Sequence, residues 1–99
     1  MSIKFAALLA EDRRLTILVL LLNSPSYAAS QYLLHSALPN FGHNIGMDQL
    51  RGDIHWLEEQ LLIDKTVIGD VYIGRLTNRG VDVAQGRVEH PGVKRPMPE

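Results

Sequence analysis

The sequence contains no cysteine among its 99 residues. This absence excludes disulfide bonds, thiolate zinc sites and thiol nucleophiles, and it fits a reducing, cytoplasmic environment. Long apolar runs are also missing. The longest, Ile17 to Leu22, has six residues, whereas a membrane span needs about 20. We therefore expect a cytoplasmic protein that does not interact with membranes.

The sequence also lacks an excess of positive charge. Its net charge is −1, so the whole protein has no general electrostatic attraction to nucleic acid. The charges are unevenly distributed. Residues 46–64 carry one arginine and five carboxylates, a net −4, which makes the middle of the chain its acidic part.

Catalytic and metal-binding patterns are missing as well. No nucleophile–base arrangement, phosphate-binding loop or dinucleotide fingerprint is present. His43 and His55 are twelve positions apart, and His55 with Glu59 has i, i+4 spacing, but no second close pair of ligands accompanies them. We expect no metal, no cofactor and no enzymatic activity.

Apolar residues at helical spacing predict three helices in the first two thirds of the chain. The first runs from about Ile3 to Leu22 and ends before Pro25. Ser30 is a suitable N-cap for a second. The third runs from Met47 to about Leu61, with Gly46 at its N-cap. Its buried face is predicted to consist of leucine and isoleucine at positions 50, 54, 57 and 61.

The pattern then changes to that of a β-hairpin. Two β-branched segments, 62–68 and 71–76, flank the two-residue turn Gly69-Asp70. Thr77 can cap a last short helix that ends at Gly86. This order predicts a mainly α protein with a small β-hairpin, an α+β winged helix–turn–helix domain over residues 1–88. The proline-rich residues 89–99 are expected to form an extended or disordered tail.

Several segments together resemble small proteins of Mu-like bacteriophages and prophages, loosely labelled arsenic-repressor-type regulators. The segments are residues 11–15, 42–43, 48–57, 76–84 and 91–96. The resemblance covers almost the whole chain and implies a phage-encoded winged helix in the cytoplasm of the bacterial host. It implies no catalytic residues. The metal-sensing label gains no support, because the cysteines that such sensors use are missing.

Double-stranded DNA is the expected partner of a winged helix, and the third helix is expected to contact the bases. Arg51 can pair with guanine and Gln49 with adenine. The candidate DNA-binding residues are Gln49, Arg51, His55, Lys65, Arg75 and Arg79. The alternative is a solvated helix face, in which Arg51 bonds to Asp48 and His55 packs beside Glu59, with the other cations dispersed over the surface.

The first helix is apolar on all sides between Leu15 and Leu22. A small core seldom covers such a helix completely, which predicts a homodimer. The interface residues are expected to be Leu15, Leu18, Leu21 and Leu22. Two functions follow: a homodimeric DNA-binding protein acting in transcriptional regulation or DNA handling, or a module that docks another phage protein in an assembly or packaging complex without binding DNA.

Overall fold

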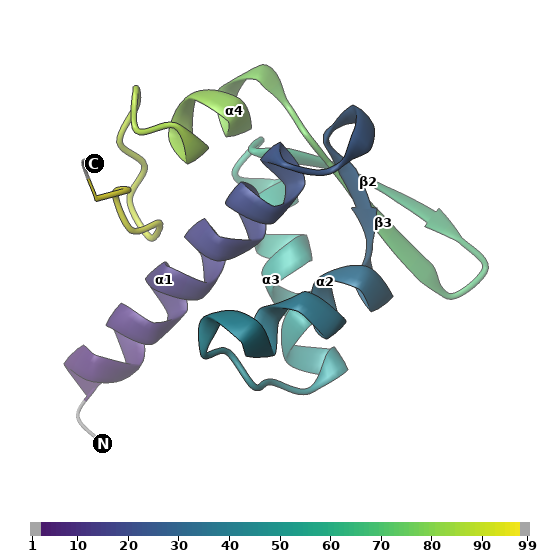
Figure 1. Cartoon of the computed structure of the whole chain (residues 1–99), viewed down its shortest axis with the longest axis horizontal. Coiled ribbons are helices and arrows are strands. Elements are labelled where there is room, and N and C mark those ends of the chain that lie inside the picture. Colours follow the sequence, from purple (N-terminus) through teal and green to yellow (C-terminus); the bar gives the residue numbers. More distant parts are fainter. Residues whose placement is uncertain (1–2, 98–99) are drawn as a thin grey trace.

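The computed structural model describes residues 3–97. Their elements follow one another as helix α1 (Ile3–Leu22), 3-10 helix η1 (Pro25–Tyr27), strand β1 (Ala28–Ser30), helix α2 (Gln31–Ala37), 3-10 helix η2 (Leu38–Phe41), helix α3 (Met47–Glu59), strands β2 (Ile63–Ile68) and β3 (Val71–Leu76), and helix α4 (Asn78–Ala84). Figure 1 shows α1 crossing the molecule, with α2 and α3 on one side of it and α4 on the other. None of these helices is both long enough and apolar enough to cross a membrane.

Two polar side chains begin helices where the sequence predicted caps. The Ser30 hydroxyl accepts a hydrogen bond from the backbone N–H of Leu33, at 3.2 Å. The Thr77 hydroxyl accepts one from Gly80, at 3.0 Å. Each bond satisfies a backbone donor that has no partner within its own helix. Gly46 is the N-cap of α3, as expected, without a side-chain bond.

The hairpin belongs to a sheet of three antiparallel strands in the order β1-β3-β2. Ile68 faces Val71 across the turn, where Gly69 has a φ of +61°, a conformation that glycine adopts at little cost. The sequence predicted only two strands. The segment Ala28–Ser30 pairs with Arg75–Ile73 as a third. Helices α2 and α3, with the β2–β3 hairpin as the wing, form a winged helix–turn–helix.

Helix α3 is shorter than the sequence predicted. It ends at Glu59, and Leu61 has a φ of +62° and is 71% exposed, so the prediction that Leu61 lies on the buried face of the helix was wrong. The N–H of Leu61 bonds to the carbonyl of Glu58, and that of Leu62 to Leu57. This is the Schellman pattern, which satisfies the last carbonyls and turns the chain. Leu62 and Ile63 then enter the core in place of Leu61.

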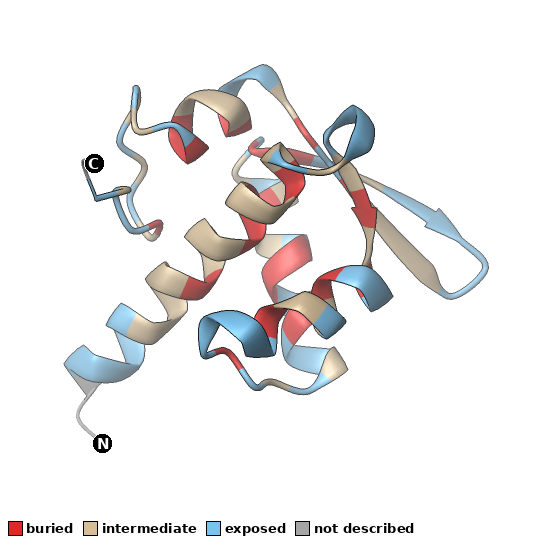
Figure 2. Cartoon of the chain, viewed as in Figure 1, coloured by how far each residue is buried: buried red, intermediate tan, exposed pale blue. Residues whose placement is uncertain are grey.

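The core contains side chains from all four α-helices, and α1 contributes three that are fully buried, Ile17, Leu18 and Leu21 (Figure 2). This corrects the predicted dimer interface. Leu18 and Leu21 are 0% exposed within their own chain, so they have no surface to offer a partner. Leu15 and Leu22 are partly buried and pack against the same core. One small domain does cover the apolar end of α1, because β1, β3 and α4 pack against this helix.

Between Gln85 and Met97 the chain contains no helix or strand but packs back onto the domain. Val93 is 8% exposed and belongs to the core. The N–H of Lys94 donates to the carbonyl of Glu11 in α1, at 3.1 Å. The sequence predicted an extended or disordered tail over residues 89–99. Residues 89–97 are instead part of the folded unit, and residues 98 and 99 lie outside the described part of the chain.

Candidate nucleic-acid interface

The outer face of α3 is the surface that a winged helix usually presents to DNA. The inner face buries Leu50, Asp53, Ile54 and Leu57. Gln49, Gly52 and His55 are exposed, as is Asp48 in the first turn. The 3.6-residue period separates these two faces and places Gln49 and Arg51 near the helix N-terminus, as the sequence predicted.

Arg51 connects α3 to the wing. Its Nη2 donates to the carbonyl of Asp70 in the hairpin turn, at 2.9 Å, and its Nε donates to the Gln31 amide oxygen, at 3.4 Å. The guanidinium also lies 5.2 Å from the centre of the Tyr72 ring. These contacts differ from the alternative in which Arg51 bonds to Asp48, and they hold its side chain at the junction of helix and wing.

Gln31 is the buried link beneath this junction. It is 0% exposed, and its amide oxygen accepts hydrogen bonds from Arg51 and from the backbone N–H of Tyr72, at 2.8 Å. Its amide nitrogen has no hydrogen-bond partner among residues 3–97. This role could not be predicted, since a glutamine in the first turn of a short helix is typical of a solvated position.

Lys65 lies on the opposite side of the junction, on strand β2. Its Nζ is 4.8 Å from the centre of the Tyr72 ring and 3.4 Å from a carboxylate oxygen of Glu58. Arg51 of α3 and Lys65 of the wing therefore share one aromatic ring. We call Arg51, Lys65 and Tyr72 the junction cluster. A cation near an aromatic face gains electrostatic stabilisation, so the Tyr72 ring stabilises both charges.

His55 lies among carboxylates. Its ring nitrogens are 3.9 Å from Glu58 and 3.8 Å from Glu59, and its side chain is 59% exposed. This arrangement agrees with the alternative in which His55 packs beside Glu59. Among residues 3–97, no three His, Asp or Glu side chains are grouped so that they could hold a metal ion.

Arg75 and Arg79 are separated from the junction cluster. On the antiparallel β2–β3 ladder, Lys65 is paired with Gly74 and Asp64 with Arg75. Paired residues share a face of the sheet and successive residues alternate, so Lys65 and Arg75 lie on opposite faces. Arg79 lies in α4, 3.5 Å from Nδ1 of His90. The structure thus brings Arg51 and Lys65 together and leaves Arg75 and Arg79 elsewhere.

Asp53, counted in the acidic middle segment, is not part of the outer surface. It is 6% exposed, and its two carboxylate oxygens accept hydrogen bonds from Arg13 of α1, at 2.5 and 3.1 Å. This bidentate pair neutralises one of the five carboxylates of residues 46–64 inside the protein. The outer face of α3 is correspondingly less acidic than the sequence suggests.

Residues 89–97 cover the side of the molecule away from the wing. The Arg14 guanidinium lies 4.1 Å from the centre of the Trp56 ring and donates to the carbonyl of Gly92, at 2.9 Å. Trp56 therefore packs at the junction of α3 with this segment. Burial raises the pKa of Asp12, but hydrogen bonds from His43 and Lys94 lower it more, leaving it below its ordinary value of 3.8.

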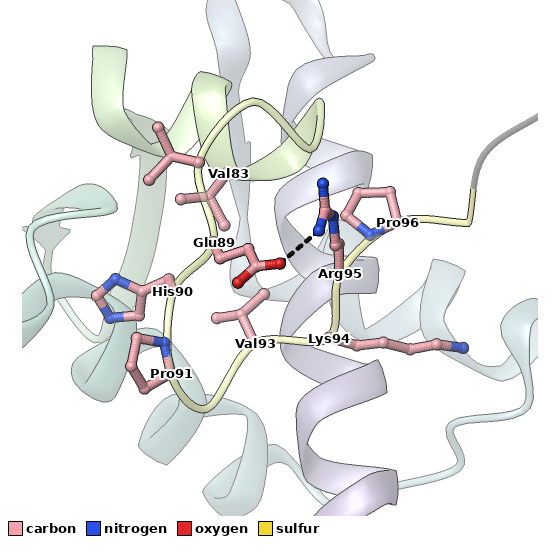
Figure 3. A pocket seen from close by; sticks show the side chains of 9 residues that line it. Val83, Glu89, His90, Pro91, Val93, Lys94, Arg95 and Pro96 are labelled. Carbon is pink, nitrogen blue, oxygen red and sulfur yellow. Dashed lines mark hydrogen bonds and ion pairs between the residues drawn. The ribbon is translucent and has the colours of Figure 1, made fainter.

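An open pocket of about 490 Å³ lies between this segment and α4 (Figure 3). Val83, Val88 and Val93 provide its apolar lining. An ion pair between Glu89 and Arg95 spans it, at 2.5 Å, and the Lys94 side chain points away from it. Both charged partners are about two-thirds exposed, so the pair is solvated and the pocket has the character of a surface groove.

No family model matches the chain. It is 44% identical over 91 residues to an uncharacterized protein, gp26, of Escherichia phage Mu, a match that covers 92% of this chain and 94% of gp26. It is 30% identical over 96 residues to an uncharacterized protein of Haemophilus influenzae, covering 96% and 93%. Among solved structures, H. salinarum RosR is similar with a TM-score of 0.65 and 20% identity. That match covers 74% of this chain and 66% of RosR, and it supports the winged-helix fold.

Proposed function

The chain belongs to the family of gp26 of phage Mu, and we propose that it binds double-stranded DNA through α3 and the wing. We further propose that it acts as a homodimer in transcriptional regulation or DNA handling in the cytoplasm of the bacterial host. The winged-helix fold supports the choice of DNA, because its third helix commonly enters the major groove. The similarity to a phage Mu protein supports the proposed setting in a bacterial host.

The observation that carries the proposal is the junction cluster. Arg51 is one turn from the start of α3, where a recognition helix contacts base edges, and Lys65 of the wing contacts the same Tyr72 ring. In this proposal Arg51 pairs with guanine, Gln49 with adenine, and Lys65 contacts a phosphate. Tyr72 keeps the two cations at a fixed spacing, so helix and wing approach the duplex as one surface.

The charge around this surface supports only modest affinity. Asp48, Glu58 and Glu59 flank the proposed contacts and repel phosphates. We assign His55, Arg75 and Arg79 smaller contributions, because His55 is surrounded by carboxylates and the two arginines lie away from the junction cluster. A dimer would double the number of cations that meet one duplex.

The test is a mobility-shift titration at low and moderate salt. We expect binding that weakens with salt, and a loss of about tenfold or more for Arg51→Ala, the range for removing a base-contacting arginine. Arg75→Ala is the matched control, since it removes a similar charge from the other face of the sheet and should change affinity less. Thermal melting of each variant verifies the fold. If the wild-type chain fails to shift DNA at low salt, the proposal is wrong.

A second candidate is a module that docks another phage protein without binding DNA. Tyr32, Leu33 and Phe41, on α2 and η2, are each more than half exposed, and the outer face of α3 is acidic. Such a mixture of apolar and acidic side chains suits a protein partner better than a phosphate backbone. Absence of a shift at low salt would favour this function.

A further inference from the structure

The first turns of α1 extend beyond the rest of the molecule. Twenty residues of helix are about 30 Å long, and only the second half of α1 crosses the core (Figure 1). Residues 4–8 are all exposed, whereas the first buried position among residues 4–22 is Arg13. The projecting end is therefore not needed to cover the core of its own chain.

This projecting end carries an apolar stripe. Phe5, Leu8 and Leu9 follow i, i+3, i+4 spacing, which places them on one face, and the carboxylate of Asp12 ends the stripe at i+7. Phe5 is 50% exposed and Leu8 is 55% exposed. The stripe borders a shallow hollow of about 300 Å³, which Glu11 and Lys94 also line. Large apolar side chains grouped beside a hollow are typical of a protein–protein contact.

The charges along the same end make the stripe complementary to itself. Lys4 lies four residues before Leu8, and Glu11 lies three residues after it. If two copies pack antiparallel around Leu8, Lys4 of each copy faces Glu11 of the partner subunit. A parallel arrangement would instead place like charges opposite each other. The antiparallel arrangement is an isologous contact with two-fold symmetry, the commonest geometry of homodimers.

We infer that the occupant of this stripe is a second copy of the chain, packed antiparallel through residues 4–12 of α1. The inference rests on the homodimer of the proposed function and specifies its surface. This surface replaces Leu18 and Leu21, which are buried in their own chain. It leaves α3 and the wing uncovered, because the N-terminal end of α1 lies away from both (Figure 1).

The experiment is sedimentation equilibrium of the full chain without DNA. We expect a wild-type dimer at micromolar concentration and a dissociation constant at least about tenfold higher for Leu8→Glu, since a central apolar contact becomes a buried charge. Leu33→Glu is the matched control. Leu33 is exposed to a similar degree, 56%, but lies on α2, so the dimer should persist. Circular dichroism verifies that both variants remain folded.

A charge swap tests the antiparallel geometry. Lys4→Glu should weaken the dimer by placing like charges together, and the addition of Glu11→Lys should restore it. A wild-type monomer at micromolar concentration would overturn both the homodimer and this surface. A wild-type dimer that survives Leu8→Glu would overturn the surface alone. DNA binding is measured separately in the mobility-shift titration, so neither outcome is confused with failure to bind DNA.

Discussion

At the scale of single residues, the ion pair between Arg13 and Asp53 joins α1 to α3 inside the protein. Their side chains are 9% and 7% exposed. Removing one partner leaves an uncompensated buried charge, which costs about 3–5 kcal/mol. We therefore expect Asp53→Ala to lower the free energy of unfolding by that amount in urea denaturation.

The matched control is Asp82→Ala. Asp82 also pairs with an arginine, Arg87, at 3.3 Å, but both side chains are well exposed. An exposed pair contributes less than about 1 kcal/mol, so this variant should unfold almost as the wild type does. Equal losses for the two variants would contradict the structural role assigned to Arg13 and Asp53.

His90 should make the stability depend on pH. Burial, together with the positive charge of Arg79, lowers the pKa of His90 below its ordinary value of 6.5. As the pH falls, the unfolded chain therefore binds this proton before the folded chain does. Neutral His90 therefore contributes fully to the free energy of unfolding above about pH 6.5. This contribution is lost as the pH falls through the lower pKa of His90 in the folded chain.

The measurement is the free energy of unfolding at a series of pH values from 8 downward, taken about one unit apart. In His90→Gln the free energy of unfolding should no longer decrease just below pH 6.5. The glutamine retains an amide that can reach Gln60, whose side-chain oxygen lies 2.9 Å from His90 Nε2. Parallel curves for the wild type and the variant would show that another group is responsible.

At the scale of helices and strands, two glycines should respond to alanine with opposite signs. A Cβ at Gly52, in the middle of α3, meets no described atom within 4 Å, whereas a Cβ at Gly80 in α4 lies 2.0 Å from the carbonyl oxygen of Leu62. Gly52→Ala should stabilise the protein by about 0.5–1 kcal/mol, because alanine loses less backbone entropy in a helix. Gly80→Ala should destabilise it by about 1–3 kcal/mol through overpacking.

Urea denaturation of both variants measures these changes. Gly52→Ala also separates stability from binding, because Gly52 lies on the outer face of α3. If the backbone there approaches DNA closely, the variant will be more stable and yet bind DNA more weakly. Destabilisation by Gly52→Ala would contradict the open space above α3, and a neutral Gly80→Ala would contradict the close packing of α4 against Leu62.

The elements with strong local signals were predictable from the sequence. Ser30 and Thr77 begin helices through their own hydroxyls, and the Gly69-Asp70 turn connects strands of matching length. The elements that depend on distant partners were not. Strand β1 has three residues and forms only because β3 lies beside it. Leu61 adopts a conformation that usually favours glycine, so the local sequence did not indicate the end of α3.

The candidate site follows the same division. The positions of Gln49 and Arg51 on α3 could be derived from helical periodicity. The pairing of Arg51 with Lys65 around Tyr72 depends on how the wing packs against α3, through the buried amide of Gln31. The separation of Lys65 from Arg75 depends on the strand register. Tertiary packing thus selects which of the predicted cations can act together.

At the scale of the whole molecule, folding rearranges the charge distribution of the sequence. The acidic middle segment loses Asp53 to a buried pair with Arg13, and Glu58 lies 3.4 Å from Lys65. Asp48 and Glu59 remain as carboxylates of the outer face, beside the cations of the junction cluster. The surface proposed to contact DNA is therefore mixed in sign, which favours weak, salt-sensitive binding if it does so.

The C-terminal segment completes the same molecule by covering Trp56, the single tryptophan of the chain. Gly92 permits this contact. Its φ is +89°, and a Cβ there would lie 2.8 Å from the Trp56 ring. Gly92→Ala should therefore lift the segment from α3, break the Arg14 hydrogen bond and expose the indole to water. We expect a red-shifted Trp56 emission and a loss of about 1–3 kcal/mol in the free energy of unfolding.

Gly46→Ala is the control for the emission, since a Cβ at Gly46 meets no described atom within 4 Å. An unchanged emission in Gly92→Ala would mean that the segment does not depend on Gly92 to cover Trp56.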